Sequence, residues 1–154
     1  MSQGIFAALE YLENEIQKID PKTDSHHGFV AIRRGNGLTL DLEERANQNR
    51  YFEMQIAIYP SDDGQAGLSG RKRSRIDCKV RYEIPTDYGF LTRMISEDTA
   101  ALIDALKAPE YDLINTGIVS VITLQPTFES ITNINGERVA HILTLPFDLL
   151  FLEA

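Results

Sequence analysis

Two carboxylates and a lysine near the middle of the chain are of the types that hold a metal ion and activate water. Asp62 and Asp77 are separated by a glycine-rich segment, and Lys79 follows two residues after Asp77. Carboxylates on neighbouring strands can bind Mg²⁺, which activates a water molecule and stabilises a leaving phosphate. Asp77 and Lys79 would share one face of a strand, because side chains two apart point the same way. Glu10 or Glu13 of the first predicted helix could complete such a site.

The order of these residues resembles the PD…(D/E)xK pattern of metal-dependent nucleases. However, Asp62 falls in the glycine-rich segment 60–70 rather than in a rigid strand, and an Asp-x-Lys on a charged strand face arises easily by chance. The competing interpretation is a solvated strand face whose charges pair across strands. We therefore keep a Mg²⁺-dependent nuclease as an alternative and expect that the protein is not an enzyme.

Other candidate nucleophiles and metal ligands are few. Cys78 is the single cysteine and falls on the apolar side of an alternating strand, which predicts a buried thiol. His26 and His27 lie beside Asp24 in a polar segment without the spacing of a zinc site, which predicts a solvated loop; His141 is the third histidine. No glycine-rich phosphate-binding motif is present. The sequence predicts no cofactor and no metal site.

A basic segment stands out in an acidic chain. Residues 71–81 carry six positive charges and one negative, so they sum to +5, and because the 154-residue chain totals −8 the remainder sums to −13. Such a strip can keep a hairpin soluble, or it can dock on the acidic body of another copy. Binding of DNA phosphates is a third interpretation, although aromatic residues for base stacking are absent from the segment's start. The predicted contact residues are Arg71, Lys72, Arg73, Arg75, Lys79 and Arg81.

The elements that carry these residues follow from hydrophobic periodicity. Residues 3–19 predict an amphipathic helix capped by Ser2, whose apolar stripe includes Phe6. Residues 29–33 and 38–42 predict short strands around Gly35-Asn36-Gly37. Residues 52–58 and 76–84 alternate cleanly, which predicts a hairpin arm at about 51–85 with a long loop.

The second half predicts one helix and two strands. The helix is expected to start at Ser96 as N-cap and to stop at Ala108-Pro109. Strands are expected at 117–124 and 139–152, joined through a turn at 133–137. Pro146 within the last strand predicts a bulge or an edge, because it donates no hydrogen bond. The whole chain, 1–154, is predicted to be one α+β domain, with a mostly antiparallel sheet on which an N-terminal and a central helix pack.

Composition narrows the cellular context. One cysteine excludes an intrachain disulfide, which fits a reducing compartment. The N-terminal segment lacks the basic start and long apolar run of a signal peptide, and no apolar run approaches 18 residues. We expect a protein that is made in the cytoplasm and has no membrane partner.

The layout resembles the tail terminator proteins of long-tailed bacteriophages, also called minor tail or tail-completion proteins. The resemblance rests on an N-terminal amphipathic helix, a strand pair with a long loop, a second helix at ISEDTAALIDAL and the closing strand ILTLPFDLLFLEA. It implies a non-enzymatic, hexameric ring of α+β subunits in the virion that caps the tail tube, ends its polymerisation and meets the head connector. It implies that DNA passes through the lumen without specific binding, and that the basic segment contacts a neighbouring subunit or the tail tube.

Two alternatives from outside that family stay open, besides the nuclease. One is a neck protein of the same virion region, which would join the connector to the tail. The other is a small adaptor that remains monomeric and binds an unidentified partner. The partner that is bound would distinguish a terminator from a neck protein, and the oligomeric state would distinguish both from the adaptor.

Overall fold

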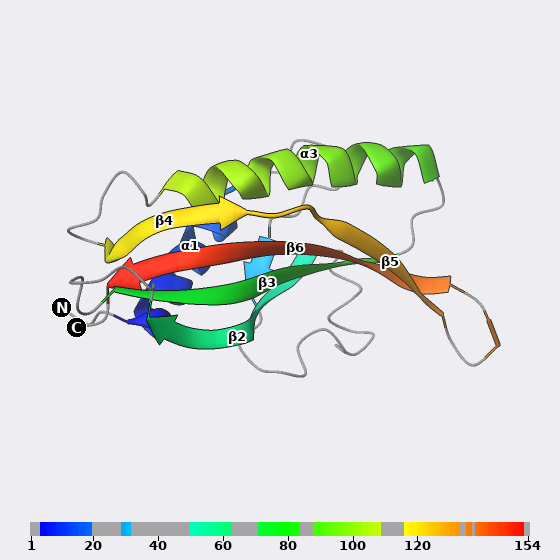
Figure 1. Ribbon diagram of the computed structural model, residues 1–154. Helices are drawn as coiled ribbons and strands as arrows, with labels where there is room; N and C mark the ends of the chain where they lie inside the picture. The colour runs from blue at the N-terminus through cyan, green and yellow to red at the C-terminus, as the bar shows by residue number, and fades with distance from the viewer. Residues whose placement is uncertain are drawn as a thin grey trace.

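A computed structural model describes residues 4–19, 29–31, 50–62, 71–83, 88–108, 116–132, 135–136 and 138–152. These residues form two helices and six strands: α1 (Ile5–Gln17), β1 (Phe29–Ala31), β2 (Arg50–Asp62), β3 (Arg71–Glu83), α3 (Tyr88–Lys107), β4 (Ile118–Thr123), β5 (Thr127–Thr132) and β6 (Arg138–Leu152). Both helices contribute to one buried core with the same face of the sheet (Figure 1). The predicted α+β fold with a mostly antiparallel sheet is confirmed.

The sheet has the order β1-β2-β3-β6-β4, and β5 also pairs with β6. β4 and β5 follow one another along the same flank of β6, opposite residues 147–151 and 138–144. Strands β2 to β6 pair antiparallel, whereas β1 pairs parallel with β2. β2 and the successive strands β4 and β5 therefore flank the long central pair of β3 and β6.

The predicted hairpin of the two alternating segments is confirmed, but it is not an arm that stands away from the body. β3 pairs with β6 over its whole length, from Arg71 opposite Leu152 to Glu83 opposite Ala140. The apolar faces of β3 and β6 lie side by side in one sheet, and both contribute to the core that the helices cover. The basic segment is consequently a central strand of the sheet.

The prediction that α3 starts at Ser96 is wrong, because the helix begins eight residues earlier, at Tyr88. Ser96 lies exposed within the helix. Glu97 and Asp98 follow Ser96 as acids of a first helical turn would, but they have other partners. Glu97 accepts a hydrogen bond from Arg93 at 3.1 Å, and Asp98 accepts one from Tyr82 at 2.7 Å. A serine followed by two acids is typical of a helix N-terminus, but here the acids serve an i,i+4 pair with Arg93 and a tertiary contact with Tyr82.

The N-terminal helix is shorter than predicted and has a different cap. Gly4 takes the N-cap position with φ of 115°, a conformation that favours glycine, and no side chain caps this end. Ser2 lies outside the described residues. Phe6 does not join the buried stripe, as 78% of its surface is exposed.

Strands at the sheet's margins also differ from the sequence prediction. β1 pairs with β2, while the predicted strand 38–42 and the turn 35–37 lie outside the described residues. β5 was missed, because Thr127–Thr132 is short, lies between turn signals and exposes most of its side chains. β5 leads into the predicted turn, where Gly136 has φ of 80°.

The prediction of a bulge or an edge at Pro146 is wrong. Pro146 lies in central β6, opposite Asp77, without a register shift. Its carbonyl accepts a hydrogen bond from the Leu124 amide at 2.8 Å, so the proline nitrogen faces the same flank. That flank is where β4 has ended and β5 has not begun. The N–H that a proline lacks would therefore point to the gap between β4 and β5, where β6 has no regular strand partner.

A buried hydrogen bond ties the sheet to α3. Tyr82 and Asp98 are both buried, and the Tyr82 hydroxyl donates to the Asp98 carboxylate. We expect Tyr82→Phe to lower the free energy of unfolding by about 1–3 kcal/mol, because a buried acceptor loses a donor. Chemical denaturation at neutral pH measures this change. The matched variant Tyr59→Phe, at a tyrosine that is 76% exposed, should change stability by less than about 0.5 kcal/mol. Equal effects of the two variants would contradict the assigned role of the bond.

Candidate functional site

The basic side chains of β3 divide between the two faces of the sheet. Cys78, Ile76 and Val80 face the helices and are fully buried, so the odd-numbered residues face the opposite side, termed here the outer face. Five of the six predicted contact residues lie on the outer face, and Lys72 lies on the other. They differ in access: Arg73 is exposed, Arg71, Lys72, Arg75 and Lys79 are half-buried, and Arg81 is buried.

Cross-strand partners neutralise part of the basic strip. Arg75 Nε lies 2.6 Å from Asp148 Oδ1 of β6. The hydrogen bond that the Arg75 guanidinium donates to the Asp148 carboxylate raises the pKa of Arg75 above its ordinary value. Lys79 is the register partner of Glu53 on β2, and Asp77 belongs to the same face. Asp148 of β6 and Glu53 of β2 thus join Asp77 on the outer face. Of the six basic residues, Arg73 is the exposed one and is therefore the best placed to contact a partner.

The structure does not bring the nuclease-like residues together. Asp62 is the register partner of Lys72, five residues from Asp77, which corresponds to about 17 Å along the strand. Glu10 and Glu13 belong to α1, which packs on the opposite face from Asp77 and Lys79. Within the described ranges no group of three or more His, Cys, Asp or Glu residues is placed to hold a metal ion. The geometry favours the interpretation of Asp77 and Lys79 as members of a charged strand face.

The thiol of Cys78 is buried, as predicted. It is fully inaccessible in the core, and desolvation, with smaller effects from the negative charges of Glu13 and Asp77, raises its pKa to about 12. A reactive cysteine needs the opposite environment, one that stabilises the thiolate. Cys78 is therefore a core residue.

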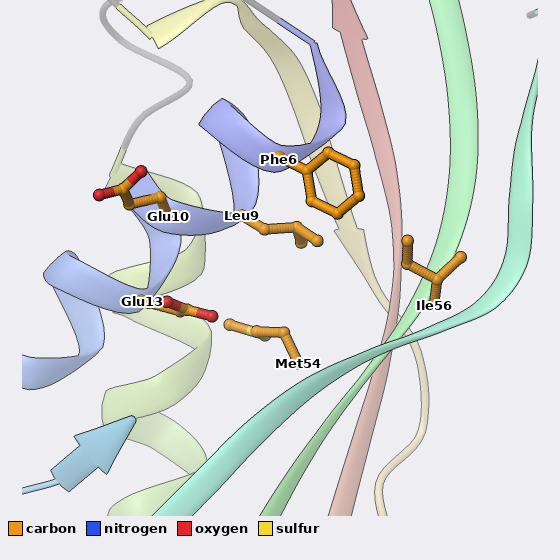
Figure 2. Close-up of a pocket in the computed structure, with 6 residues that line it drawn as sticks. All are labelled: Phe6, Leu9, Glu10, Glu13, Met54 and Ile56. Atoms are coloured by element: carbon orange, nitrogen blue, oxygen red, sulfur yellow. The ribbon is translucent and has the colours of Figure 1, made fainter. Parts of the chain in front are cut away.

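A pocket of about 280 Å³ lies between α1 and β2. Figure 2 shows its lining: the apolar side chains of Phe6, Leu9, Met54 and Ile56, with Glu10 and Glu13. Glu13 points toward Met54, whereas the Glu10 carboxylate is turned away from the other lining residues. A single inward carboxylate among apolar groups does not form an acid–base pair. One lining residue, Phe6, follows Ile5 of the apolar stripe directly and is the one sign of this pocket in the sequence.

His141 has a structural environment at the β5–β6 end of the sheet. It is buried, its Nδ1 lies 2.9 Å from the Ser130 hydroxyl, and its ring stacks on Phe128 with centroids 5.3 Å apart. Tyr82, the register partner of His141 on β3, donates its hydroxyl to Asp98 of α3. Ser130 and Phe128 both belong to β5, so these contacts fasten β5 to β6.

Neither described helix combines the length and the apolarity needed to cross a bilayer. Comparison with known proteins adds no family: no protein-family model matches the chain, and no curated protein is significantly similar to it.

Proposed function

We propose that this chain is a structural protein of a phage tail, which forms a ring that caps the tail tube and joins it to the head connector. The observation that carries the proposal is the arrangement of the described elements. An N-terminal helix, a strand pair, a second helix and a long closing strand occur in the order on which the resemblance rests. The closing strand β6 is central and mostly apolar, with Asp148 paired to Arg75 on the outer face. The charged residues that suggested catalysis lie apart, which favours a role in assembly.

In this proposal the exposed end of β3 contacts the tail tube. Arg73 is exposed beside half-buried Arg71 and Lys72, at the end of the sheet where β3 begins. The rest of the chain is strongly acidic, so a basic contact point sets orientation by charge complementarity. The acidic excess would keep passing DNA from adhering to the lumen.

The oligomeric state of the purified protein tests the ring. Light scattering and electron microscopy are expected to show a closed ring of about six copies with a central hole. A strictly monomeric protein over a wide concentration range would contradict the proposal. Metal-dependent cleavage of DNA by the monomer, lost in Asp77→Ala, would instead support the nuclease alternative.

A charge reversal tests the contact with the tail tube. We expect Arg73→Glu to weaken binding of the ring to purified tail tubes of the same phage about fivefold, since a contact at the rim of an interface is worth about 1 kcal/mol. The matched control is Lys107→Glu, at an exposed lysine at the end of α3 on the helix side. Arg75 is unsuitable, because its reversal would place a carboxylate against Asp148. Equal losses in the two variants, or no loss in Arg73→Glu, would remove the basic strand from the contact.

A further inference from the structure

The pocket between α1 and β2 combines apolar walls with one buried acid. Phe6 and Leu9 of α1 face Met54 and Ile56 of β2 across a space of about 280 Å³ (Figure 2). Glu13 belongs to the same lining, points toward Met54 and is only 8% exposed. A charge attracts an opposite charge more strongly in such surroundings than in water, because the effective dielectric constant is lower.

The Glu13 carboxylate lies toward the sheet, at the buried end of the pocket. Its negative charge contributes to the raised pKa of Cys78, the register partner of Met54 on β3. Glu10, the second acid of the lining, is exposed and its carboxylate is turned away from the other lining residues. The described lining contains no basic residue. A ligand that enters along the apolar walls therefore reaches one carboxylate at the far end.

This arrangement fits a cation on an apolar stem. A lysine side chain has a compact charge on a four-carbon stem, which suits a single carboxylate behind apolar walls, whereas an arginine brings a planar fork with five donors. A carboxylate has about four acceptor positions, so Glu13 can accept from a ligand in addition to any donor of its own chain. The volume lies just below the about 300–1,000 Å³ of pockets that hold drug-sized ligands. It therefore suits one side chain.

Exposed apolar groups beside the pocket indicate that the lysine belongs to a polypeptide. Phe6, part of the wall, is 78% exposed, and Tyr59, three residues beyond Ile56 on β2, is 76% exposed. A small free amine would leave both side chains in water, whereas residues that flank a lysine in a protein would cover them. The net charge of −8 also favours the approach of a basic partner.

We propose that the α1–β2 pocket receives a lysine side chain of a partner protein. The stem of the lysine packs between the walls from α1 and β2, and its ammonium group donates to the Glu13 carboxylate. Apolar residues next to the lysine cover Phe6 and Tyr59. This contact goes beyond the proposed ring, and it lies on the opposite side of the sheet from Arg73.

Binding of short peptides, followed by nuclear magnetic resonance, tests the site. The chain carries ¹³C in the methyl groups of its three methionines, so that Met54 reports on the pocket and Met94, in the core, on the fold. The probe is Leu-Lys-Leu with blocked ends, and its uncharged counterpart has norleucine in place of lysine. We expect the lysine peptide to shift the Met54 signal and to bind about tenfold more tightly than the norleucine peptide. Equal affinities, or no shift of Met54, would overturn the proposal.

The two acids of the lining provide matched variants. We expect Glu13→Gln to weaken binding of the lysine peptide about tenfold and to leave the norleucine peptide nearly unaffected. Glu10→Gln should change either affinity by less than about twofold, because this carboxylate is exposed and turned away. Equal losses in the two variants would show attraction by overall charge instead of a site at Glu13.

A change in the apolar wall keeps the test decisive if the Met94 signal shows that Glu13→Gln does not fold. Phe6→Ala alters an exposed position, so we expect an intact fold. It should weaken binding of both peptides about threefold, since each loses an apolar contact. Unchanged affinities would overturn the proposed position of the stem.

Butylammonium alone distinguishes a free amine from a lysine within a protein. It has the stem and the charge but lacks the flanking leucines, so we expect it to bind at least about fivefold more weakly than the lysine peptide. Equally tight binding would assign the pocket to free amines and overturn the partner protein. Because the isolated chain is measured, a protein that forms no ring can still bind the peptide, and a ring that binds no peptide leaves the proposed function standing.

Discussion

Phe147→Ala is expected to lower the free energy of unfolding by about 3–5 kcal/mol, a large part of the stability of a typical domain. Phe147 is completely buried on β6, with Ile76 of β3 and Thr123 of β4 as its register neighbours. Its ring faces the core that the two helices close, so removal leaves a cavity enclosed on several sides. The surrounding strands are held by backbone pairing and would collapse into this cavity only in part.

Phe128→Ala is the matched control for this substitution. It removes the same group from β5 of the same sheet, where the ring is 43% exposed and stacks on His141. We expect a loss of roughly 1 kcal/mol for this exposed stacking contact. Urea unfolding at one fixed protein concentration compares the variants, because assembly makes apparent stability depend on concentration. Losses of similar size would contradict the complete burial of Phe147.

Stability is expected to fall at alkaline pH because of Cys78. Burial, aided by Glu13 and Asp77, raises the pKa of this thiol from 9.0 to about 12. The unfolded chain then loses its proton from pH 9 upward, while the folded chain retains it until about pH 12. Stability is fully present below pH 9 and declines above it, by about 1.4 kcal/mol per pH unit and about 4 kcal/mol in all.

Cys78→Ala isolates this contribution. The variant is less stable at neutral pH, because it loses buried volume, but it should lack the decline due to the thiol. Unfolding measured from pH 8 to pH 10.5 gives the difference in slope, since other titrating groups contribute equally to both proteins. If the free energies of unfolding of the wild type and of Cys78→Ala fall with pH at the same slope, the thiol is accessible to water in the folded chain. A thiol reagent at pH 8 gives a second measure: it should modify Cys78 only after unfolding.

Alternation within strands was predictable because it is local. The period of two in residues 76–84 determines which side chains of β3 share a face wherever the strand is placed. The buried Cys78 and the inward-facing Tyr82 follow from this alternation and are confirmed. The apolar run 139–152 likewise predicted a strand, and that strand, β6, is central in the sheet.

Other features depended on which strands and helices meet. The start of α3 was missed because Asp98 resembles a first-turn acid in sequence, while in space it receives the Tyr82 hydroxyl. Pro146 is accommodated within a central strand because β4 gives way to β5 beside it, an event determined by the connection at residues 124–126. Neither contact leaves a signal in the local pattern.

The alternating faces, the apolar closing strand and the charge contrast between residues 71–81 and the rest of the chain can be read from the sequence alone. What those features face depends on contacts that form only in the folded chain. Pairing with β6 turned the basic segment into a central strand, and its position beside Asp148 and Glu53 offset part of its charge. Local periodicity orients a side chain relative to its own strand, whereas exposure depends on contacts between residues distant in sequence.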